Sequence, residues 1–179
     1  MAEMARDQLN MEYVMMITSP NPPHRHTDLL DAELRHELVQ AAVQDNPKLF
    51  ASRLELERQG PSYTADTLKQ IQEDLSHLGV HINLIIGEDN LPFISQWRNA
   101  DEIFRLCRIV VAPRETQPAH TEMLIPGNVP SQADVVRLQI PHIGVSSSNI
   151  RQRVREGKSI LYLVPPSVSA IIGQKGLYK

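Results

Sequence analysis

Three consecutive serines and a nearby arginine form the strongest chemical signal in the sequence. Ser146, Ser147 and Ser148 open a predicted helix, and Arg151 lies on its first turn. The unpaired backbone N–H groups of a helix start attract anions, and the helix dipole adds to that attraction. Serine hydroxyls supply further donors, and a guanidinium can bind a phosphate through two N–H groups. These residues predict a phosphate site, with a serine cap and a solvated arginine as the alternative.

A stiff loop with two basic side chains follows a predicted strand. The apolar run at residues 13–18 indicates a buried strand, and Asn21-Pro22-Pro23-His24-Arg25 comes after it. Ligands of open α/β sheets bind at the carboxyl ends of the strands. His24 and Arg25 are therefore candidates for holding phosphates. The alternative is a proline-rich surface loop.

A glycine and an aspartate follow a second predicted strand. The apolar run Ile82–Ile86 ends at Gly87, and Asp89 comes two residues later. Glycine allows a ligand to approach the backbone closely. A carboxylate can accept hydrogen bonds from ribose hydroxyls. The pair predicts a nucleotide contact at this strand end, and helix capping by Asp89 is the alternative.

Two further segments carry aromatic side chains. Trp97 is the only tryptophan, and in a cleft its ring could stack on a heteroaromatic base; a core tryptophan is the alternative. Tyr63 and Thr64 stand at the start of a predicted helix, where N–H donors could meet a carboxylate. For that segment the alternative is a simple capped helix, with Ser62 or Thr64 as the cap.

The elements expected to position these residues are those of an α/β fold. Short apolar, β-branched runs alternate with helical periodicity, which is typical of a parallel sheet. Strands are predicted at residues 13–18, 49–56, 82–86, 108–112 and 135–140. Helices are predicted at residues 1–11, 31–45, 64–78, 100–106, 146–156 and 165–173. Gly79 is expected to end the helix at 64–78.

The composition is that of an ordinary globular protein, and we expect a single domain over residues 1–179. The net charge is −3, so no global basic field favours nucleic acid or an acidic membrane. No apolar run approaches the roughly 20 residues that span a bilayer. Cys107 is the only cysteine, which excludes an intrachain disulfide and fits a reducing compartment; we expect it to be buried. We predict a cytoplasmic protein, and a homo-oligomer stays open.

The order of the motifs is more specific than any one of them. The chain contains, in succession, NPPHR, GPSYTADTL, GED, Trp97 eight residues after Asp89, VVAPR, VSSSNIR, YLVPPSV and a final GLY. This succession resembles the bacterial nicotinate-nucleotide adenylyltransferases of the nucleotidyltransferase superfamily, over almost the whole chain. The SSS-x-IR element is shared with the wider superfamily, including pantetheine-phosphate adenylyltransferase. NPPHR and GPSYTADTL point to the nicotinate branch.

The resemblance implies a Rossmann-like nucleotidyltransferase fold, with a parallel sheet and helices on both of its faces. It also implies residues that bind ATP. The positions matching the ATP and phosphate site are His24, Gly87, Asp89, Arg114, Ser146, Ser147, Ser148 and Arg151. Arg25 and Arg151 match the positions that act on the reacting phosphates, and Gly87 and Asp89 match the adenosine side.

The nicotinate side of the site is implied in the same way. Trp97 matches the aromatic residue that stacks on the nicotinate ring. Tyr63 and Thr64 match the segment near the nicotinate carboxylate, where backbone N–H groups favour the acid over the amide. The implied partners are therefore ATP and nicotinate mononucleotide.

The implied reaction is an in-line attack by the mononucleotide phosphate on the α-phosphorus of ATP. Deamido-NAD forms and pyrophosphate leaves, with Mg²⁺ held by the ATP phosphates. No covalent enzyme intermediate is needed. Catalysis would rest on positioning and on charge stabilisation.

One departure from the family pattern affects both the sheet and the chemistry. The family begins with a strand and a G-x-F-D-P-x-H-x-G-H turn, whereas residues 1–5 here already match the helix that follows them. The first strand is central in a sheet of order 3-2-1-4-5. The strands at 13–18 and 82–86 are thus expected to lack a ladder partner between them.

Two interpretations of this departure are open. The natural protein is longer, or the chain folds with a gapped sheet and has little catalytic activity. In the latter case it is a catalytically dead nucleotide-binding relative. Pantetheine-phosphate adenylyltransferase is the alternative enzyme, and Tyr63, Thr64 and Trp97 argue against it.

Overall fold

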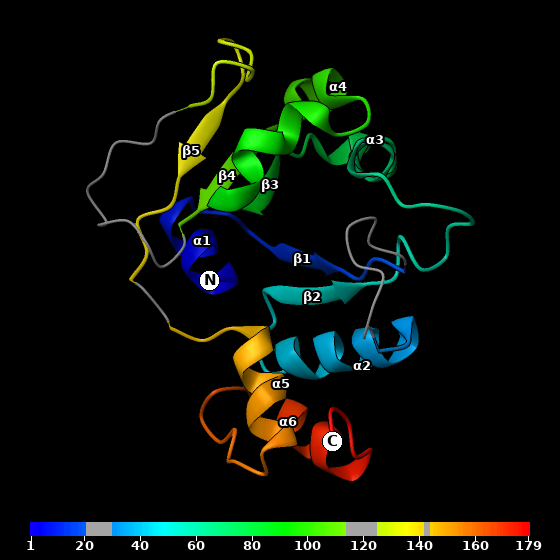
Figure 1. Cartoon of the computed structure of the whole chain (residues 1–179). Helices are drawn as coiled ribbons and strands as arrows, with labels where there is room; N and C mark the ends of the chain where they lie inside the picture. The colour runs from blue at the N-terminus through cyan, green and yellow to red at the C-terminus, as the bar shows by residue number, and fades with distance from the viewer. Residues whose placement is uncertain (21–29, 114–124, 142–143) are drawn as a thin grey trace. The chain divides into compact units, whose positions relative to one another are not determined.

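The computed structural model describes residues 1–20, 30–113, 125–141 and 144–179. Within it the chain forms two compact units, which are described separately. The first unit comprises Met1–Met11 and Gly60–His142, and the second comprises Glu12–Gln59 and Ile143–Lys179. Figure 1 labels the helices and strands of both.

The first unit is built on a three-stranded parallel sheet. Its strands are β3 (Ile82–Gly87), β4 (Cys107–Ala112) and β5 (Val135–Arg137), in the order β3-β4-β5. Ile82 lies opposite Cys107, and Ile109 lies opposite Val135. The central strand β4 is buried from Ile109 to Ala112, as expected for an apolar run covered on both faces.

Helices of the first unit cover both faces of this sheet. Alternate side chains of β4 enter two different core clusters, because successive residues of a strand point to opposite faces. Ile109 and Val111 pack with residues of α3 (Thr64–Asp74), the 3-10 helix η2 (Glu88–Gln96) and α4 (Ala100–Leu106). Val110 and Ala112 pack with Ala5 of α1 (Ala2–Gln8). The prediction of helices on both faces is confirmed in this unit.

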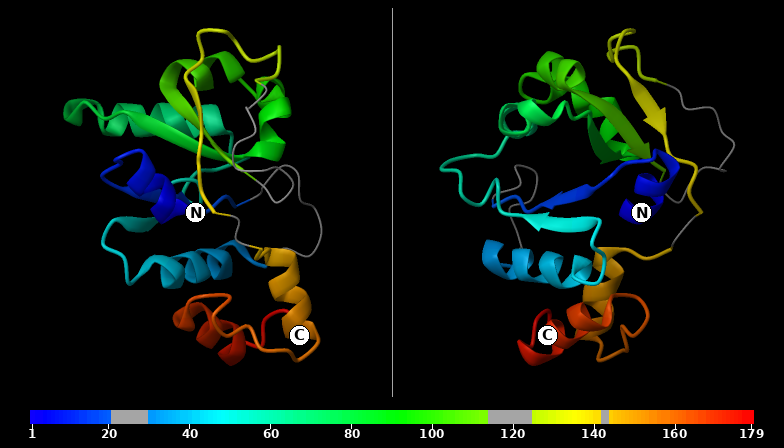
Figure 2. Two further views of the ribbon diagram at one scale, coloured as in Figure 1. Left: turned by 90° about the vertical axis from the view of Figure 1, so that its left-hand side faces the viewer. Right: turned by 180° about the vertical axis from the view of Figure 1, so that it is seen from behind.

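The second unit has a two-stranded parallel sheet and three helices. Strand β1 (Val14–Ile17) pairs with β2 (Leu49–Ser52). The helices are α2 (Ala32–Val43), α5 (Ser147–Arg155) and α6 (Pro166–Gln174). Their apolar faces share one core cluster that includes Ala41, Ile150 and Ile172, and Figure 2 shows the three helices from two further sides.

The described residues form two separate parallel sheets, one in each unit. In the described ranges, β1 is hydrogen-bonded to β2 and β3 to β4, and the two sheets share no ladder. As expected, β1 and β3 each have a single hydrogen-bonded neighbour, although the interior strand of a parallel sheet normally has two.

Most predicted elements are present, with corrected ends. The strand predicted at 49–56 stops at Ser52, whose Oγ accepts a hydrogen bond from the Leu54 N–H at 3.2 Å. The strand predicted at 135–140 stops at Arg137. Residues 88–96 form a 3-10 helix that the periodicity did not predict. The helix predicted at 64–78 ends at Asp74 with Leu75 as its C-cap, and Gly79 instead ends the separate 3-10 helix η1 (Ser76–Leu78) at a positive φ of 61°.

No helix in the described part of the chain is long and apolar enough to cross a bilayer. Cys107 is buried, as predicted. Burial raises the pKa of its thiol to about 12, and the Sγ–H donates to the Ile103 carbonyl at 3.2 Å. This cysteine is therefore an unreactive part of the core.

Candidate nucleotide-binding site

The serine motif forms the start of α5 in the second unit. Ser146 is the N-cap, and its Oγ accepts a hydrogen bond from the Asn149 N–H at 3.2 Å. Ser147 and Ser148 follow on the first turn, and all three serines are exposed. Ile150 is buried in the core and holds this turn in place. The first turn contains no acidic residue, so nothing on it competes with an anion for the helix start.

Arg151 lies beside this helix start, as the sequence predicted. Its Nη2 donates to the Ser148 Oγ at 3.3 Å. The guanidinium is partly exposed and keeps further N–H donors for a ligand. Hydroxyls, a helix start and a guanidinium thus converge on one patch of the second unit, and such a patch suits a phosphate group.

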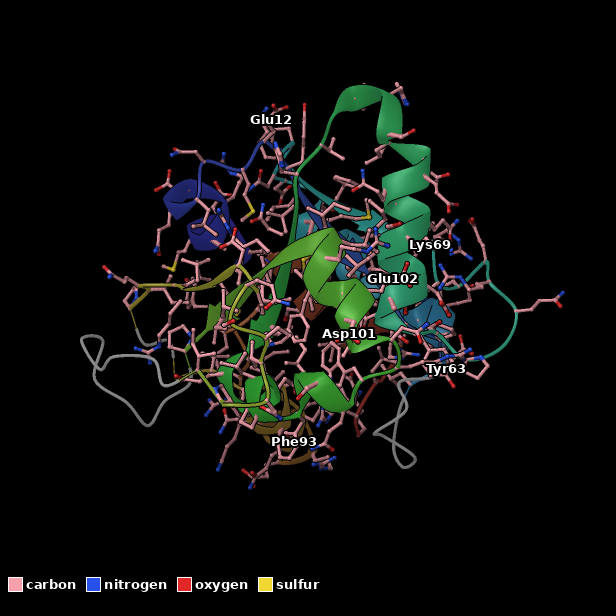
Figure 3. The ribbon with its side chains drawn as sticks, turned by 90° about the horizontal axis from the view of Figure 1, so that it is seen from above. Glu12, Tyr63, Lys69, Phe93, Asp101 and Glu102 are labelled. Carbon is pink, nitrogen blue, oxygen red and sulfur yellow. The ribbon has the colours of Figure 1, made fainter. Side chains whose placement is uncertain are left out.

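The helix start at Tyr63 and Thr64, in the first unit, is built differently. Tyr63, not Ser62 or Thr64, occupies the N-cap of α3, and its side chain makes no capping bond. The predicted serine or threonine cap is wrong, because the backbone turns one residue away from either candidate. Ser62 is instead buried, 8% exposed, and its Oγ has no hydrogen-bond partner among the described residues. Figure 3 shows Tyr63 at this end of α3.

Trp97 follows η2 and is partly buried. Its side chain packs against the core cluster that contains Ala65 and Ile94, and its backbone N–H donates to the Ile94 carbonyl at 3.1 Å. Trp97 is therefore part of the core packing, which agrees with the alternative of a core tryptophan. It is only partly buried, so part of the residue stays accessible. Arg98, the next residue, stacks on the Tyr63 ring, with its Cζ 4.3 Å from the ring centroid. This contact brings the Trp97 and Tyr63 segments together.

Gly87 and Asp89 lie at the carboxyl end of β3, as predicted. Gly87 is the last residue of the strand and pairs with Ala112. Its φ is −69°, so a positive φ is not the reason for a glycine there. Asp89 lies on the first turn of η2.

An ion pair that sequence reasoning missed crosses the same sheet edge. Arg137 Nε lies 3.3 Å from Glu88 Oε1, and their side chains are only 10% and 24% exposed. Arg137 ends β5 and Glu88 directly follows β3, so the pair spans β4 and fixes the turn between Gly87 and Asp89. No spacing in the sequence could reveal it, because the two residues are 49 positions apart.

Three predicted residues, His24, Arg25 and Arg114, lie outside the described residues. The side chain of Arg35 forms hydrogen bonds with described residues on both sides of the range 21–29. Arg35 donates to the carbonyls of Ser19 at 2.6 Å, Pro20 at 2.7 Å and Leu30 at 3.1 Å. A cation on α2 therefore holds the end of the β1 segment close to the start of α2.

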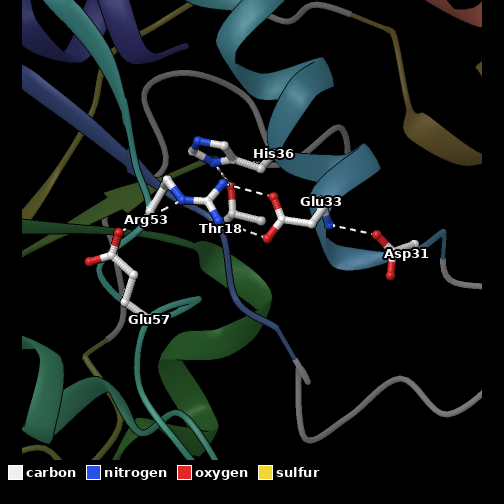
Figure 4. Close-up of polar contacts among 6 residues, drawn as sticks. All are labelled: Thr18, Asp31, Glu33, His36, Arg53 and Glu57. Atoms are coloured by element: carbon white, nitrogen blue, oxygen red, sulfur yellow. Dashed lines mark hydrogen bonds and ion pairs between the residues drawn. The ribbon is translucent and has the colours of Figure 1, made fainter.

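A polar cluster lies beside this junction in the second unit (Figure 4). Thr18 Oγ1 and His36 Nδ1 are 3.1 Å apart, and both side chains are buried. Nearby, Arg53 binds both carboxylate oxygens of Glu33, each at 2.7 Å. That hydrogen bonding lowers the pKa of Glu33 and raises the pKa of Arg53. The cluster ties α2 to the ends of β1 and β2.

The candidate residues thus fall into two groups. Tyr63, Thr64, Gly87, Asp89 and Trp97 belong to the first unit, and the serine–arginine motif of α5 belongs to the second. Within the first unit, Arg98 joins the Trp97 segment to the start of α3. Within the second, Ser148 and Arg151 are in contact.

The parallel sheets flanked by helices and the serine–arginine helix start define a nucleotidyltransferase-type protein. The cytidylyltransferase-like family model matches residues 1–153 of the chain. A nicotinic acid mononucleotide adenylyltransferase from Plasmodium falciparum, complexed with NaAD, is similar in fold, with a TM-score of 0.71. It is 17% identical and covers 98% of this chain and 89% of its own.

Curated relatives narrow the class. A nicotinate-nucleotide adenylyltransferase of Caldicellulosiruptor bescii is 34% identical over 180 residues, which is 100% of this chain and 90% of that protein. One from Thermus thermophilus is 33% identical over 178 residues, 99% of this chain and 89% of that protein. The chain belongs to the nicotinate-nucleotide adenylyltransferase family.

Proposed function

We propose that this chain transfers the adenylyl group of ATP to nicotinate mononucleotide, forming deamido-NAD and pyrophosphate in NAD biosynthesis. The observation that carries the proposal is the start of α5. There Ser147 and Ser148 are exposed, the first turn is free of acids, and Arg151 lies beside Ser148. Family membership supplies the substrates: the relatives named above act, by their names, on nicotinate nucleotide.

In the proposed reaction, a phosphate oxygen of the mononucleotide attacks the α-phosphorus of ATP. A new phosphorus–oxygen bond forms, the bond to the bridging oxygen of pyrophosphate breaks, and pyrophosphate carries the electron pair away. The start of α5 and the Arg151 guanidinium would hold the phosphates and stabilise the charge that builds up on their oxygens. No side chain needs to become covalently attached.

Mg²⁺ is proposed as the metal partner, held by the ATP phosphates. Oxygen-rich phosphates are the ligands that this cation prefers, and it neutralises their charge when bound. Among the described residues, no three His, Cys, Asp or Glu side chains gather as a metal-binding group. The chain's own contribution there is the positive charge of Arg151.

The acceptor side is proposed to lie in the first unit. Trp97 would stack on the nicotinate ring, and the N–H groups at the start of α3 would face its carboxylate. Gly87 and Asp89 would contact the adenosine part of ATP. The remaining candidates, His24, Arg25 and Arg114, are proposed to contact the ATP and mononucleotide phosphates.

Pyrophosphate release tests the proposal directly. The purified chain is incubated with ATP, Mg²⁺ and nicotinate mononucleotide, with parallel samples that contain nicotinamide mononucleotide or phosphopantetheine instead. Release with the nicotinate substrate, and little with the others, is the expected result. Release with phosphopantetheine alone would replace the proposed acceptor. Nucleotide binding without release from any acceptor would contradict the proposed reaction.

A further inference from the structure

The side chain of Arg98 is distinctive in the first unit. Its guanidinium stacks on the Tyr63 ring, with the Cζ 4.3 Å from the centroid, which is within the range of a cation–π contact. The other arginines that the structure describes in this unit each have an acidic partner. They are Arg6 with Glu3, Arg105 with Glu102, Arg108 with Asp134 and Arg137 with Glu88. Arg98 has no such partner in the described part of the unit.

The stacked geometry leaves this cation available to a ligand. A guanidinium that lies over a ring uses its face, while the N–H groups at its edge still point outward. Arg98 is exposed, so an incoming anion can reach those N–H groups. Tyr63 fixes the position of the guanidinium, which lowers the entropy lost when an anion binds.

The surroundings of Arg98 also favour an anion. Tyr63 is the N-cap of α3 and makes no side-chain capping bond, so the backbone N–H groups of this helix start are not capped by it; Asp66 is an acidic residue on the same first turn. Ser62, the preceding residue, has a buried hydroxyl without a partner among the described residues. Trp97, the ring proposed to stack on the pyridine, is adjacent to Arg98 in the chain. An exposed cation and the start of α3 thus lie beside the Tyr63 ring, next to Trp97 in the chain.

We propose that Arg98 is a further specificity-determining residue, which adds to the backbone N–H groups at the start of α3 in selecting nicotinate mononucleotide over nicotinamide mononucleotide. The two acceptors differ only in a ring carboxylate, which is negative, and a ring amide, which is neutral. A guanidinium forms an ion pair with hydrogen bonds to the carboxylate, in which both partners are charged, but with the amide oxygen it forms a hydrogen bond in which only the donor is charged. Tyr63 acts as a positioning residue that holds Arg98. This inference rests on the proposed function, since it assumes that the mononucleotide binds beside Trp97.

Trp97 provides a test that does not require turnover. It is the only tryptophan, so quenching of intrinsic fluorescence reports ligand binding next to it. The chain is titrated with nicotinate mononucleotide and with nicotinamide mononucleotide, in the absence of ATP. For Arg98→Gln we expect the Kd of the nicotinate ligand to rise about tenfold, and that of the nicotinamide ligand to change less than about twofold. Arg98→Lys should retain part of the preference.

Two further variants separate charge from structure. Lys69→Gln removes an exposed positive charge from α3, the helix that begins at Tyr63, and should leave both Kd values unchanged; Figure 3 labels both residues. Tyr63→Leu keeps the guanidinium but removes the ring beneath it. It should lower the preference for nicotinate less than Arg98→Gln does. Circular dichroism of each variant checks that the fold is kept.

The outcomes separate this inference from the proposed function. Equal weakening of both ligands by Arg98→Gln, or an unchanged Kd for nicotinate mononucleotide, would overturn the role of Arg98. The proposed function would survive if the unaltered chain still released pyrophosphate with that substrate. An unaltered chain whose fluorescence responds to neither mononucleotide would overturn the role of Arg98, and the additional absence of pyrophosphate release would overturn the proposed function as well.

Discussion

Two helix starts, one in each unit, present similar backbone chemistry in different ways. At α5 the cap, the hydroxyls and the arginine come from six consecutive residues, Ser146–Arg151, and contact one another within one turn. At α3 the N-cap residue makes no side-chain bond, and the cation comes from Arg98, 35 positions away along the chain. The first site is assembled by local sequence and the second by tertiary packing.

The serines at the two helix starts also contribute differently to the stability of the fold. The hydroxyl of Ser146 contributes to the stability of α5 because it satisfies a backbone N–H. The hydroxyl of Ser62 contributes nothing comparable, because it is buried without a partner among the described residues. At α5 one serine stabilises the helix start, whereas at α3 the neighbouring serine is buried and gives no such hydrogen bond among the described residues.

Removing the arginine of α5 should give the largest effect. Arg151→Gln leaves the helix and its cap intact but removes the charge beside the phosphates. We expect kcat/KM for adenylyl transfer to fall about a hundredfold, as when one stabilising group of a transition state is lost. Arg155→Gln, on the exposed last turn of the same helix, is the matched control. A loss no greater than that of the control would mean that α5 does not contact the reacting phosphates.

Ser146→Ala should act on stability more than on chemistry. The Asn149 N–H loses its acceptor, and the free energy of unfolding should fall by about 1 kcal/mol in urea titrations. Ser146→Asp, which keeps a capping oxygen, should restore the stability. It should also weaken ATP binding, because it places a negative charge at the phosphate site. If the aspartate variant bound ATP as well as the unaltered chain, an anion site at this helix start would be contradicted.

The fold was largely predictable because the strands are long apolar runs. Ile109, Val110 and Val111 are buried on both faces of the sheet, so their continuous hydrophobicity indicated an interior parallel strand. The ends of elements were less predictable, since β2 stops where the Ser52 hydroxyl binds a backbone N–H. The helix η2 was missed because Pro92 interrupts the usual helical pattern. A single domain over residues 1–179 stays a prediction.

The candidate site was predictable only where its residues are close together in the sequence. The motif from Ser146 to Arg151 could be recognised because its members are neighbours in the chain, and the structure places Arg151 against Ser148. The Arg98–Tyr63 stack and the Arg137–Glu88 ion pair could not be recognised. Their members come from separate elements that only the folded sheet brings together. The roles of His24, Arg25 and Arg114 stay predictions.

The smallest expected effect concerns Ser62, next to the start of α3. The sign of the change in the free energy of unfolding shows whether this serine stabilises the fold. Ser62→Ala removes a buried hydroxyl that has no partner among the described residues, so the free energy of unfolding should stay the same or rise by about 0.5 kcal/mol. Because the hydroxyl is buried, the same variant should change the Kd of nicotinate mononucleotide by less than about twofold. Ser76→Ala, which alters a hydroxyl bonded to the Glu73 carbonyl, should leave that Kd unchanged. A variant that is both less stable and unaltered in binding would show that Ser62 serves the fold, as Ser146 does. The contrast between the two helix starts would then rest on Arg98 alone.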